Sequence, residues 1–249
     1  MVFIRQHSKT NPMKKEAIIM AKKRLTFGNK VIEFYKTLIP PHIPLKGIGV
    51  ILPYEDQEVL EYTEKFFNKF FRDTRKRVFV LGINPGRFGS GTTGIPFTDP
   101  VSLENACGIV NKLVKRREIS SEFMYRFIEH WGGARAFYRD FFLTAISPIG
   151  FVYDGKNCNY YDDQTLFRSV KPFIVHTLEE QFAFGARKNT AIVLGSGKNQ
   201  KIFNALNLEH GWFKKVYVLE HPRFIMQYRR KKMQYYLNKY QDIFSRALL

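Results

Sequence analysis

Four short apolar runs, with longer helix-like stretches between them, constrain the fold of this chain more than any other feature. The runs are Val78–Ile83, Phe142–Ile146, Ala191–Leu194 and Val216–Leu219. Short continuous apolar runs are typical of strands that are buried on both faces, and strands that alternate with helices are typical of parallel sheets. We therefore predict an α/β fold in which helices cover both faces of a parallel sheet.

The stretches around these runs have the apolar spacing of helices. They are Gly28–Leu38, Gln57–Phe71, Val101–Lys115, Ser121–Glu129, Asp163–Phe184, Asn199–Leu206 and Phe224–Phe244. Because no linker interrupts the pattern, we predict a single domain over residues 26–249, preceded by a basic segment, residues 1–25, that we expect to be disordered. This segment lacks an apolar region followed by a small-residue cleavage site, so we expect neither a signal peptide nor a membrane anchor.

Three of the predicted strands end in a polar residue that is followed by proline. The first ends in Asn84-Pro85, the second in Ser147-Pro148 and the fourth in His221-Pro222. Proline holds the preceding residue in an extended conformation. The carboxyl ends of parallel strands meet at the edge of the sheet where open α/β folds bind ligands. We therefore predict that these polar residues share one site.

His221 is the first candidate for chemistry. Pro222 suits the first position of a helix, which would place His221 at the N-cap. The helix dipole disfavours a cation there, so we expect a neutral imidazole that can donate a hydrogen bond to a developing anion. Taken alone, His221 is more simply explained as a helix cap, and the glycine-rich loop after the first strand favours the functional interpretation.

Two glycine-rich segments follow predicted strands. The first, Phe79–Pro100, reads FVLGINPGRFGSGTTGIPFTDP, and its glycines let the backbone approach a ligand without a Cβ in the way. The second, Gly195–Lys201, reads GSGKNQK. Neither has the spacing of a Walker A loop or a dinucleotide-binding motif. For the second we predict phosphate binding by backbone amides, Lys198 and Lys201 near a helix N-terminus, with a simple tight turn as an equal alternative.

Charge and cysteine content indicate the partner and the compartment. Forty Lys and Arg against 22 Asp and Glu give a net charge of +18, and basic residues alternate with aromatic ones in MQYRRKKMQYYLNKY. This pattern favours nucleic acid as the partner over a merely solvated surface.

Two cysteines are too few for a four-cysteine zinc or iron–sulfur site and are typical of a reducing cytoplasm. No apolar run approaches the length of about 20 residues that a membrane-spanning helix needs, so we expect no membrane partner.

Several segments resemble one enzyme family. GINPGRFGSGTTGIPF, Gly82–Phe97, is similar to the first motif of the single-strand-selective monofunctional uracil-DNA glycosylases. LEHPRF resembles their second motif, which begins with His-Pro, and GARAFYRDFF and FFLTAISPIGF follow the family's order. The resemblance extends from about Gly47 to the C-terminal helix. Its first motif is long and specific, whereas the second is short.

The resemblance implies a uracil-DNA glycosylase-like fold, a three-layer sandwich with a central four-stranded parallel β-sheet flanked by helices. It also implies hydrolysis of the N-glycosidic bond of a deaminated base in DNA, as in base-excision repair, without a lyase step, metal or cofactor. By match to the family's motifs, the catalytic residues are Asn84, which holds the attacking water, and His221, which stabilises the departing base anion.

The resemblance further implies residues that contact the base and the DNA. Phe97 matches the residue that stacks on the flipped base, and the amide of Ile83 lies where the family's backbone contacts the base. The expected base-binding residues are Ile83, Gly86, Phe97, Ala145 and Ser147. The expected DNA-binding residues are Gly195, Ser196, Gly197, Lys198, Lys201, Arg223 and Phe224.

The sequence departs from the family at two places. Ala145 stands where the family has an Asn that reads the edge of uracil. The alanine side chain cannot form a hydrogen bond to a base and is smaller than asparagine. We therefore predict a roomier pocket that accepts uracil and also a larger deaminated base such as xanthine. HPRFIMQYRR replaces the family's proline-rich wedge, and Arg223 and Phe224 are the candidates to fill the vacated stack.

We predict a monofunctional DNA glycosylase for deaminated bases that acts as a monomer on single- or double-stranded DNA in the cytoplasm, associated with the nucleoid if the source is bacterial. One alternative is a nucleotide or nucleoside hydrolase, which would not need a net charge of +18. The other is a single-stranded nucleic-acid-binding module without catalysis. The Asn-Pro and His-Pro strand ends argue against that module.

Overall fold

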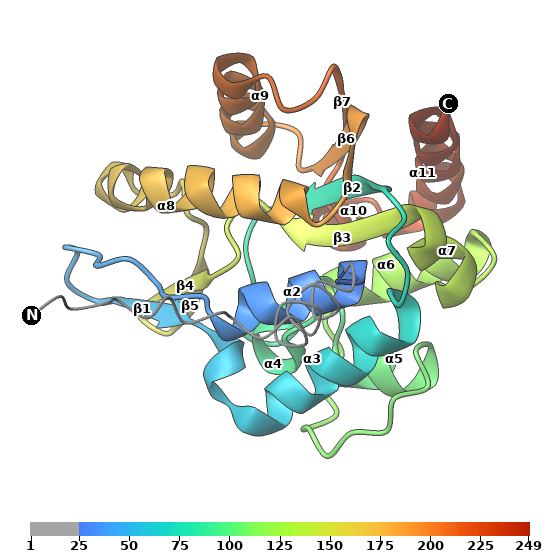
Figure 1. Ribbon diagram of the computed structural model, residues 1–249, viewed down its shortest axis with the longest axis horizontal. Coiled ribbons are helices and arrows are strands. Elements are labelled where there is room, and N and C mark those ends of the chain that lie inside the picture. The colour runs from blue at the N-terminus through green and yellow to red at the C-terminus, as the bar shows by residue number, and fades with distance from the viewer. Residues whose placement is uncertain (1–24) are drawn as a thin grey trace, which may run out of the picture.

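The computed structural model describes residues 25–249. Its central sheet has the strand order β3-β2-β6-β7, and all neighbouring strands are parallel (Figure 1). The strands are β2 (Arg77–Gly82), β3 (Phe141–Ala145), β6 (Ala186–Leu194) and β7 (Lys215–Leu219). The predicted four-stranded parallel sheet is confirmed, although β6 begins before the predicted run.

Ten helices of the described residues surround the sheets. They are α2 (Phe27–Lys36), α3 (Gln57–Phe70), α4 (Ser90–Thr93), α5 (Pro100–Asn105), α6 (Ile119–His130), α7 (Ala134–Asp140), α8 (Gln164–Ala183), α9 (Lys198–His210), α10 (Pro222–Tyr228) and α11 (Met233–Leu248). Short 3₁₀ turns form at η1 (Pro53–Glu55) and η2 (Arg230–Lys232). Among these helices, none is both long and apolar enough to cross a bilayer.

Two adjacent residues of β3 show that helices cover both faces of the sheet. Successive side chains of a strand point to opposite faces. The ring of Phe142 packs on Phe27 of α2, with centroids 5.0 Å apart. The ring of Phe141 packs on Phe244 of α11, with centroids 4.8 Å apart. Figure 1 shows α11 together with α6 and α7 on the right of the sheet, so the predicted three-layer sandwich is confirmed.

Two predicted helices are wrong in extent. The helix predicted over residues 101–115 ends at Asn105, and Gly108 adopts a φ of 60°, outside the right-handed helical region. The helix predicted over residues 224–244 is divided between α10 and α11. Four consecutive cations, Arg229–Lys232, lie at the division, where their mutual repulsion opposes a continuous helical turn. The N-terminal segment predicted to be disordered lies outside the described residues except for Leu25.

A second, antiparallel sheet was not predicted. Its order is β1-β4-β5, with β1 (Ile48–Ile51), β4 (Gly150–Tyr153) and β5 (Lys156–Cys158). The β4–β5 turn, Asp154-Gly155, has φ values of 45° and 68°. Asp-Gly is strongly preferred in two-residue hairpin loops, so the sequence did contain a local signal for this hairpin.

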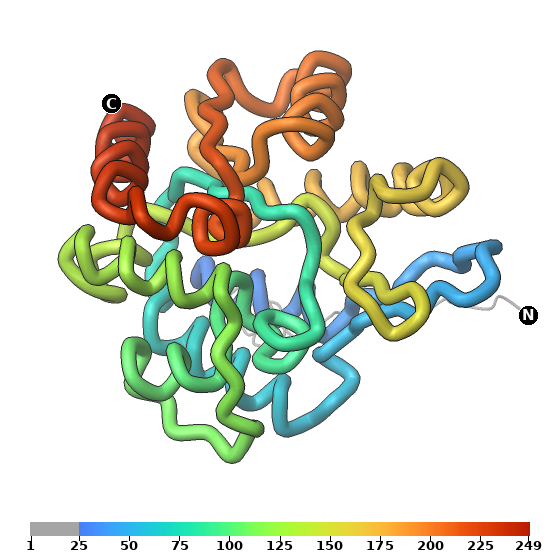
Figure 2. The backbone as a smooth tube through the Cα atoms, turned by 180° about the vertical axis from the view of Figure 1, so that it is seen from behind, coloured from blue at the N-terminus to red at the C-terminus, as the bar shows by residue number. Residues whose placement is uncertain are grey.

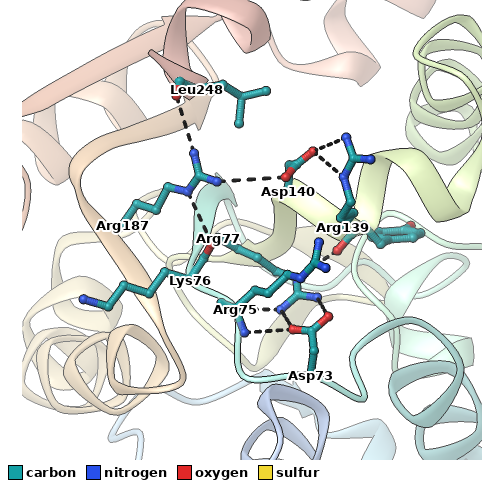
Figure 3. Close-up of polar contacts among 9 residues, drawn as sticks. Asp73, Arg75, Lys76, Arg77, Arg139, Asp140, Arg187 and Leu248 are labelled. Atoms are coloured by element: carbon teal, nitrogen blue, oxygen red, sulfur yellow. Dashed lines mark hydrogen bonds and ion pairs between the residues drawn. The ribbon is translucent and has the colours of Figure 1, made fainter.

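Arg77 anchors the amino end of β2, opposite to the end where the predicted site residues lie. Its side chain is fully buried, and Nε donates to the carbonyl of Tyr138 over 2.8 Å. Its two terminal nitrogens donate to the two carboxylate oxygens of Asp73, each over 3.0 Å (Figure 3). The guanidinium also lies 4.8 Å and 4.7 Å from the ring centroids of Phe27 and Phe71. Every part of this cation therefore has a structural partner.

Candidate active site

The strand ends of the central sheet open onto a cavity of about 390 Å³. This volume lies within the range of small-ligand sites. Figure 2 shows the loop that follows β2, in teal, beside the C-terminal segment that contains α10, in red, and both contribute to the cavity wall. The predicted site residues that line the cavity are Ile83, Asn84, Gly86, Phe97, Ala145, His221, Arg223 and Phe224.

The β4–β5 hairpin and the residues after it hold Asn84 in one orientation. Its amide nitrogen donates to the carbonyls of Pro85 and Cys158, each over 3.2 Å. Its Oδ1 accepts a hydrogen bond from the backbone N–H of Tyr160 over 3.2 Å. A carboxamide oxygen has two acceptor sites. One acceptor site of Asn84 is therefore left for a small ligand such as water.

His221 lies at the N-cap of α10, as the His-Pro pair predicts. Its Nδ1 accepts a hydrogen bond from the backbone N–H of Arg223 over 3.2 Å. Burial, helped by the positive charge of Arg223, lowers the pKa of His221 from 6.5 to about 4. The imidazole is therefore neutral at neutral pH, and because Nδ1 is the acceptor, Nε2 carries the proton. This gives the cavity a neutral hydrogen-bond donor.

Phe97 approaches the sheet more closely than any side chain at position 82 would allow. A Cβ added to Gly82 would lie 2.6 Å from Cζ of the Phe97 ring. Phe97 also adopts a φ of 57°, which is strained for a residue other than glycine. Thr93 supports this conformation, because its hydroxyl donates to the carbonyl of Thr98 over 2.7 Å. The ring centroids of Phe97 and His221 lie 5.8 Å apart, so the two rings face one cavity.

Ala145 and Ser147 are placed differently. Ala145 ends β3, pairs in register with Gly82 and lines the cavity. Ser147 is fully buried and does not line the cavity. Its hydroxyl donates to the carbonyl of Ile149 over 2.8 Å, so it shapes the turn before β4. Ser147 is therefore not a residue of the proposed base site.

The second glycine-rich segment forms the turn between β6 and α9, outside the cavity lining. Gly195 and Gly197 have φ values of 121° and 124°, which favour glycine. Lys198 begins α9 and is exposed. The turn is linked to the cavity by Tyr160, whose hydroxyl donates to Oδ1 of Asn199 over 2.9 Å and whose N–H bonds to Asn84.

Sequence reasoning missed several polar residues of the cavity wall. Asn157 and Asn159 line it from the hairpin end, which the Asp-Gly turn could have indicated. Glu118 also lines it, but its carboxylate accepts hydrogen bonds from Ser121 N over 2.9 Å and Ser120 Oγ over 3.0 Å. Glu118 therefore caps α6 and is not a free base.

The carboxylates near the strand ends are engaged in the fold. Asp99 and Asp163 cap α5 and α8, as expected of residues that precede helices. Asp162 bonds to the backbone N–H of Asn159 over 2.8 Å. Within residues 25–249, no group of three or more His, Cys, Asp or Glu side chains is placed to hold a metal ion. The described site thus offers a neutral imidazole, an amide oxygen and an aromatic face.

Comparisons with known proteins agree with this geometry. The family model of the Uracil DNA glycosylase superfamily matches residues 69–244. The crystal structure of wild-type SMUG2 from Pedobacter heparinus is similar to this chain, with a TM-score of 0.86 and 40% identity over 89% of this chain and 98% of that one. None of the curated proteins compared with the chain matches it. The family match includes both the loop after β2 and the helix after β7.

Proposed function

This chain belongs to the Uracil DNA glycosylase superfamily, and we propose that it is a monofunctional glycosylase that removes uracil and xanthine from DNA in base-excision repair. Membership supports a DNA glycosylase activity of the uracil type. The observation that carries the finer proposal is the convergence of Asn84, Phe97 and His221 on one cavity, with Ala145 beside them.

The proposed reaction separates the base as an anion while the sugar becomes cation-like. The free acceptor site of Asn84 Oδ1 holds a water molecule at the sugar carbon and orients it without deprotonating it. The Nε2–H of His221 donates to the oxygen of the departing base. One such donor contributes about 3–4 kcal/mol to transition-state stabilisation. No free carboxylate is required, because the leaving base is stabilised instead of the water being activated.

The base reaches this cavity by leaving the base stack. Extrusion costs a few kcal/mol and is least costly for a mispaired or unpaired base. The Phe97 ring, held rigidly over Gly82, provides the stacking surface that replaces the lost base stack. Ala145 leaves room beside the base, which is why we propose xanthine as well as uracil.

The test uses labelled oligonucleotides that each contain one uracil or one xanthine. Incubation with the protein, followed by hot alkali, is expected to cleave the strand at that base, because alkali breaks abasic sites. Asn84→Ala is expected to abolish most of this cleavage, and an oligonucleotide without a deaminated base serves as the control. Absence of cleavage on both bases contradicts the glycosylase proposal, and cleavage without alkali contradicts the monofunctional assignment.

A further inference from the structure

The floor of the cavity contains side-chain hydroxyl groups, which can form hydrogen bonds that the side chain of Ala145 cannot. Tyr35 from α2 and Thr144 from β3 line the cavity together with Ala145. Tyr35 is 3% exposed and Thr144 is 1% exposed, so both are reached only through the cavity. Since the Ala145 side chain has no polar atom, a side-chain hydrogen bond to this side of a bound base must come from such neighbours.

The Tyr35 hydroxyl lies in a cluster of buried hydroxyls, and the side chains of Tyr54 and Thr144 are its hydrogen-bond partners. The ring of Tyr35 stacks on Tyr54 with centroids 4.0 Å apart, and the Tyr54 hydroxyl donates to the carbonyl of Gly94 over 2.8 Å. Because Tyr54 donates its proton to Gly94, the Tyr35 hydroxyl keeps its own proton for donation within this cluster or to a ligand. A polar ligand in the cavity can therefore accept the Tyr35 proton in place of a neighbouring hydroxyl.

The two hydroxyls have opposite hydrogen-bonding roles. Burial raises the pKa of Tyr35 to about 12, against a smaller lowering by Tyr54 and Thr144, so Tyr35 keeps its proton and is a donor. The Thr144 hydroxyl donates its proton to Oε1 of Gln181, which leaves the Thr144 oxygen as an acceptor. Gln181 is 1% exposed, and within residues 25–249 its Nε2 has no partner, so this polar cluster has a donor left for a ligand.

We propose that Tyr35 and Thr144 read the polar edge of the base, with the Tyr35 O–H donating to a ring carbonyl and the Thr144 oxygen accepting from the adjacent ring N–H. This inference rests on the proposed function, because it requires a base in the cavity. Uracil and xanthine both present a carbonyl beside an N–H. Cytosine and adenine present an amino group beside an unprotonated ring nitrogen, so a donor would face a donor. The floor therefore discriminates uracil from cytosine and xanthine from adenine by polarity, and a site built on such bonds rejects the wrong partner strongly. Guanine and thymine also present a carbonyl beside an N–H, so this polarity does not act against them.

Tyr35→Phe removes the donor and keeps the ring. Its single-turnover excision of uracil and xanthine is expected to fall about tenfold, the effect of one lost hydrogen bond. Tyr138→Phe is the matched control, because its hydroxyl is equally buried but bonds to Tyr125 outside the cavity lining. Excision by this control is expected to match wild type.

A second substrate distinguishes contact with the base from a structural effect. In 4-thiouracil, sulfur replaces the oxygen of the ring carbonyl at position 4. Sulfur accepts hydrogen bonds weakly, so the loss of rate caused by Tyr35→Phe is expected to shrink toward none on this base. An equal defect on uracil and 4-thiouracil would overturn the assignment of Tyr35 to that oxygen.

Two substitutions of Thr144 test the inference if Tyr35→Phe does not fold. Thr144→Ser keeps the oxygen and is expected to retain uracil excision within a few fold, whereas Thr144→Val is expected to lose about tenfold or more. Wild-type rates for both Tyr35→Phe and Thr144→Val would overturn this inference and leave the proposed function intact. A wild-type protein that excises no base would overturn the proposed function itself.

Discussion

Backbone contacts orient the two side chains at the centre of the site. Asn84 is fixed by two carbonyls and one N–H, and His221 by the N–H of Arg223. The prolines after both residues made these positions predictable from sequence. Glu118 and Tyr35 were not predictable, because they reach the cavity only through tertiary packing of α6 and α2. The positive φ of Phe97 was hidden for the same reason.

The lowered pKa of His221 predicts the pH dependence of excision. The neutral ring accepts from Arg223 through Nδ1, and protonation at Nδ1 would break this bond. The single-turnover rate is therefore expected to stay level as pH falls past about 6.5, the ordinary histidine value, and to decline only near pH 4. The measurement is a rate profile over this range with DNA at saturating protein. An inflection near pH 6.5 that His221→Ala removes would show that the pKa is not lowered.

Ala145→Asn tests whether this position faces the base. Asparagine would add an amide to the wall beside Gly82 and narrow the cavity. The ratio of uracil to xanthine excision is expected to rise. The corresponding difference in activation free energy is about 1–2 kcal/mol, the contribution of one hydrogen bond whose partner is desolvated. Both rates are measured under single turnover for wild type and variant. An unchanged ratio would mean that residue 145 does not contact the base.

At the scale of elements, buried apolar strands and helix caps were predictable from the sequence, but pairings between distant strands were not. The strands β2, β3, β6 and β7 follow from their apolar runs. The pairing of β1 with β4 joins residues about a hundred positions apart, which periodicity cannot reveal. That small sheet matters to the site, because the hairpin brings Cys158 and Tyr160 to Asn84.

Arg77 shows how the other end of the sheet is secured. Arg77→Met keeps much of the side-chain volume but removes the bonds to Tyr138 and Asp73. We expect a loss of about 2–4 kcal/mol in the free energy of unfolding, since the Tyr138 carbonyl loses its partner and the cation leaves the Phe27 and Phe71 rings. Urea denaturation measures this loss.

Arg139→Met is the control for Arg77. The Arg139 side chain is 59% exposed and pairs with Asp140 at the surface (Figure 3). Exposed pairs of this kind contribute about 0–1 kcal/mol. If the two variants are equally stable, the Arg77 network does not stabilise the fold as described.

At the scale of the whole molecule, charge is the property that sequence alone fixes most fully. The net charge of +18 implies attraction to a polyanion over distances limited by salt. The folded arrangement adds direction, because Arg223 and the 39%-exposed Phe224 lie at the cavity wall. The composition could predict DNA as a partner, but it could not predict which cations lie near the site.

DNA affinity is expected to fall steeply with salt. The logarithm of the binding constant should decline by roughly 0.7–0.9 per phosphate contact for each tenfold rise in salt. Lys198→Ala should weaken binding to all sequences alike and reduce this slope by about one contact. Lys36→Ala, which removes an equal charge from α2 where Lys36 pairs with Glu64, should change the slope less. Equal slopes for the two variants would exclude Lys198 from the phosphate contacts.

The most direct test of the account is single-turnover excision of uracil by wild type and His221→Ala at saturating protein, scored by alkaline cleavage. Loss of the Nε2–H donor is expected to lower the rate about 100- to 1,000-fold, as for other oxyanion donors, while DNA affinity stays unchanged. A variant that binds DNA normally and excises uracil at nearly the wild-type rate would contradict the assignment of the chemistry to this cavity.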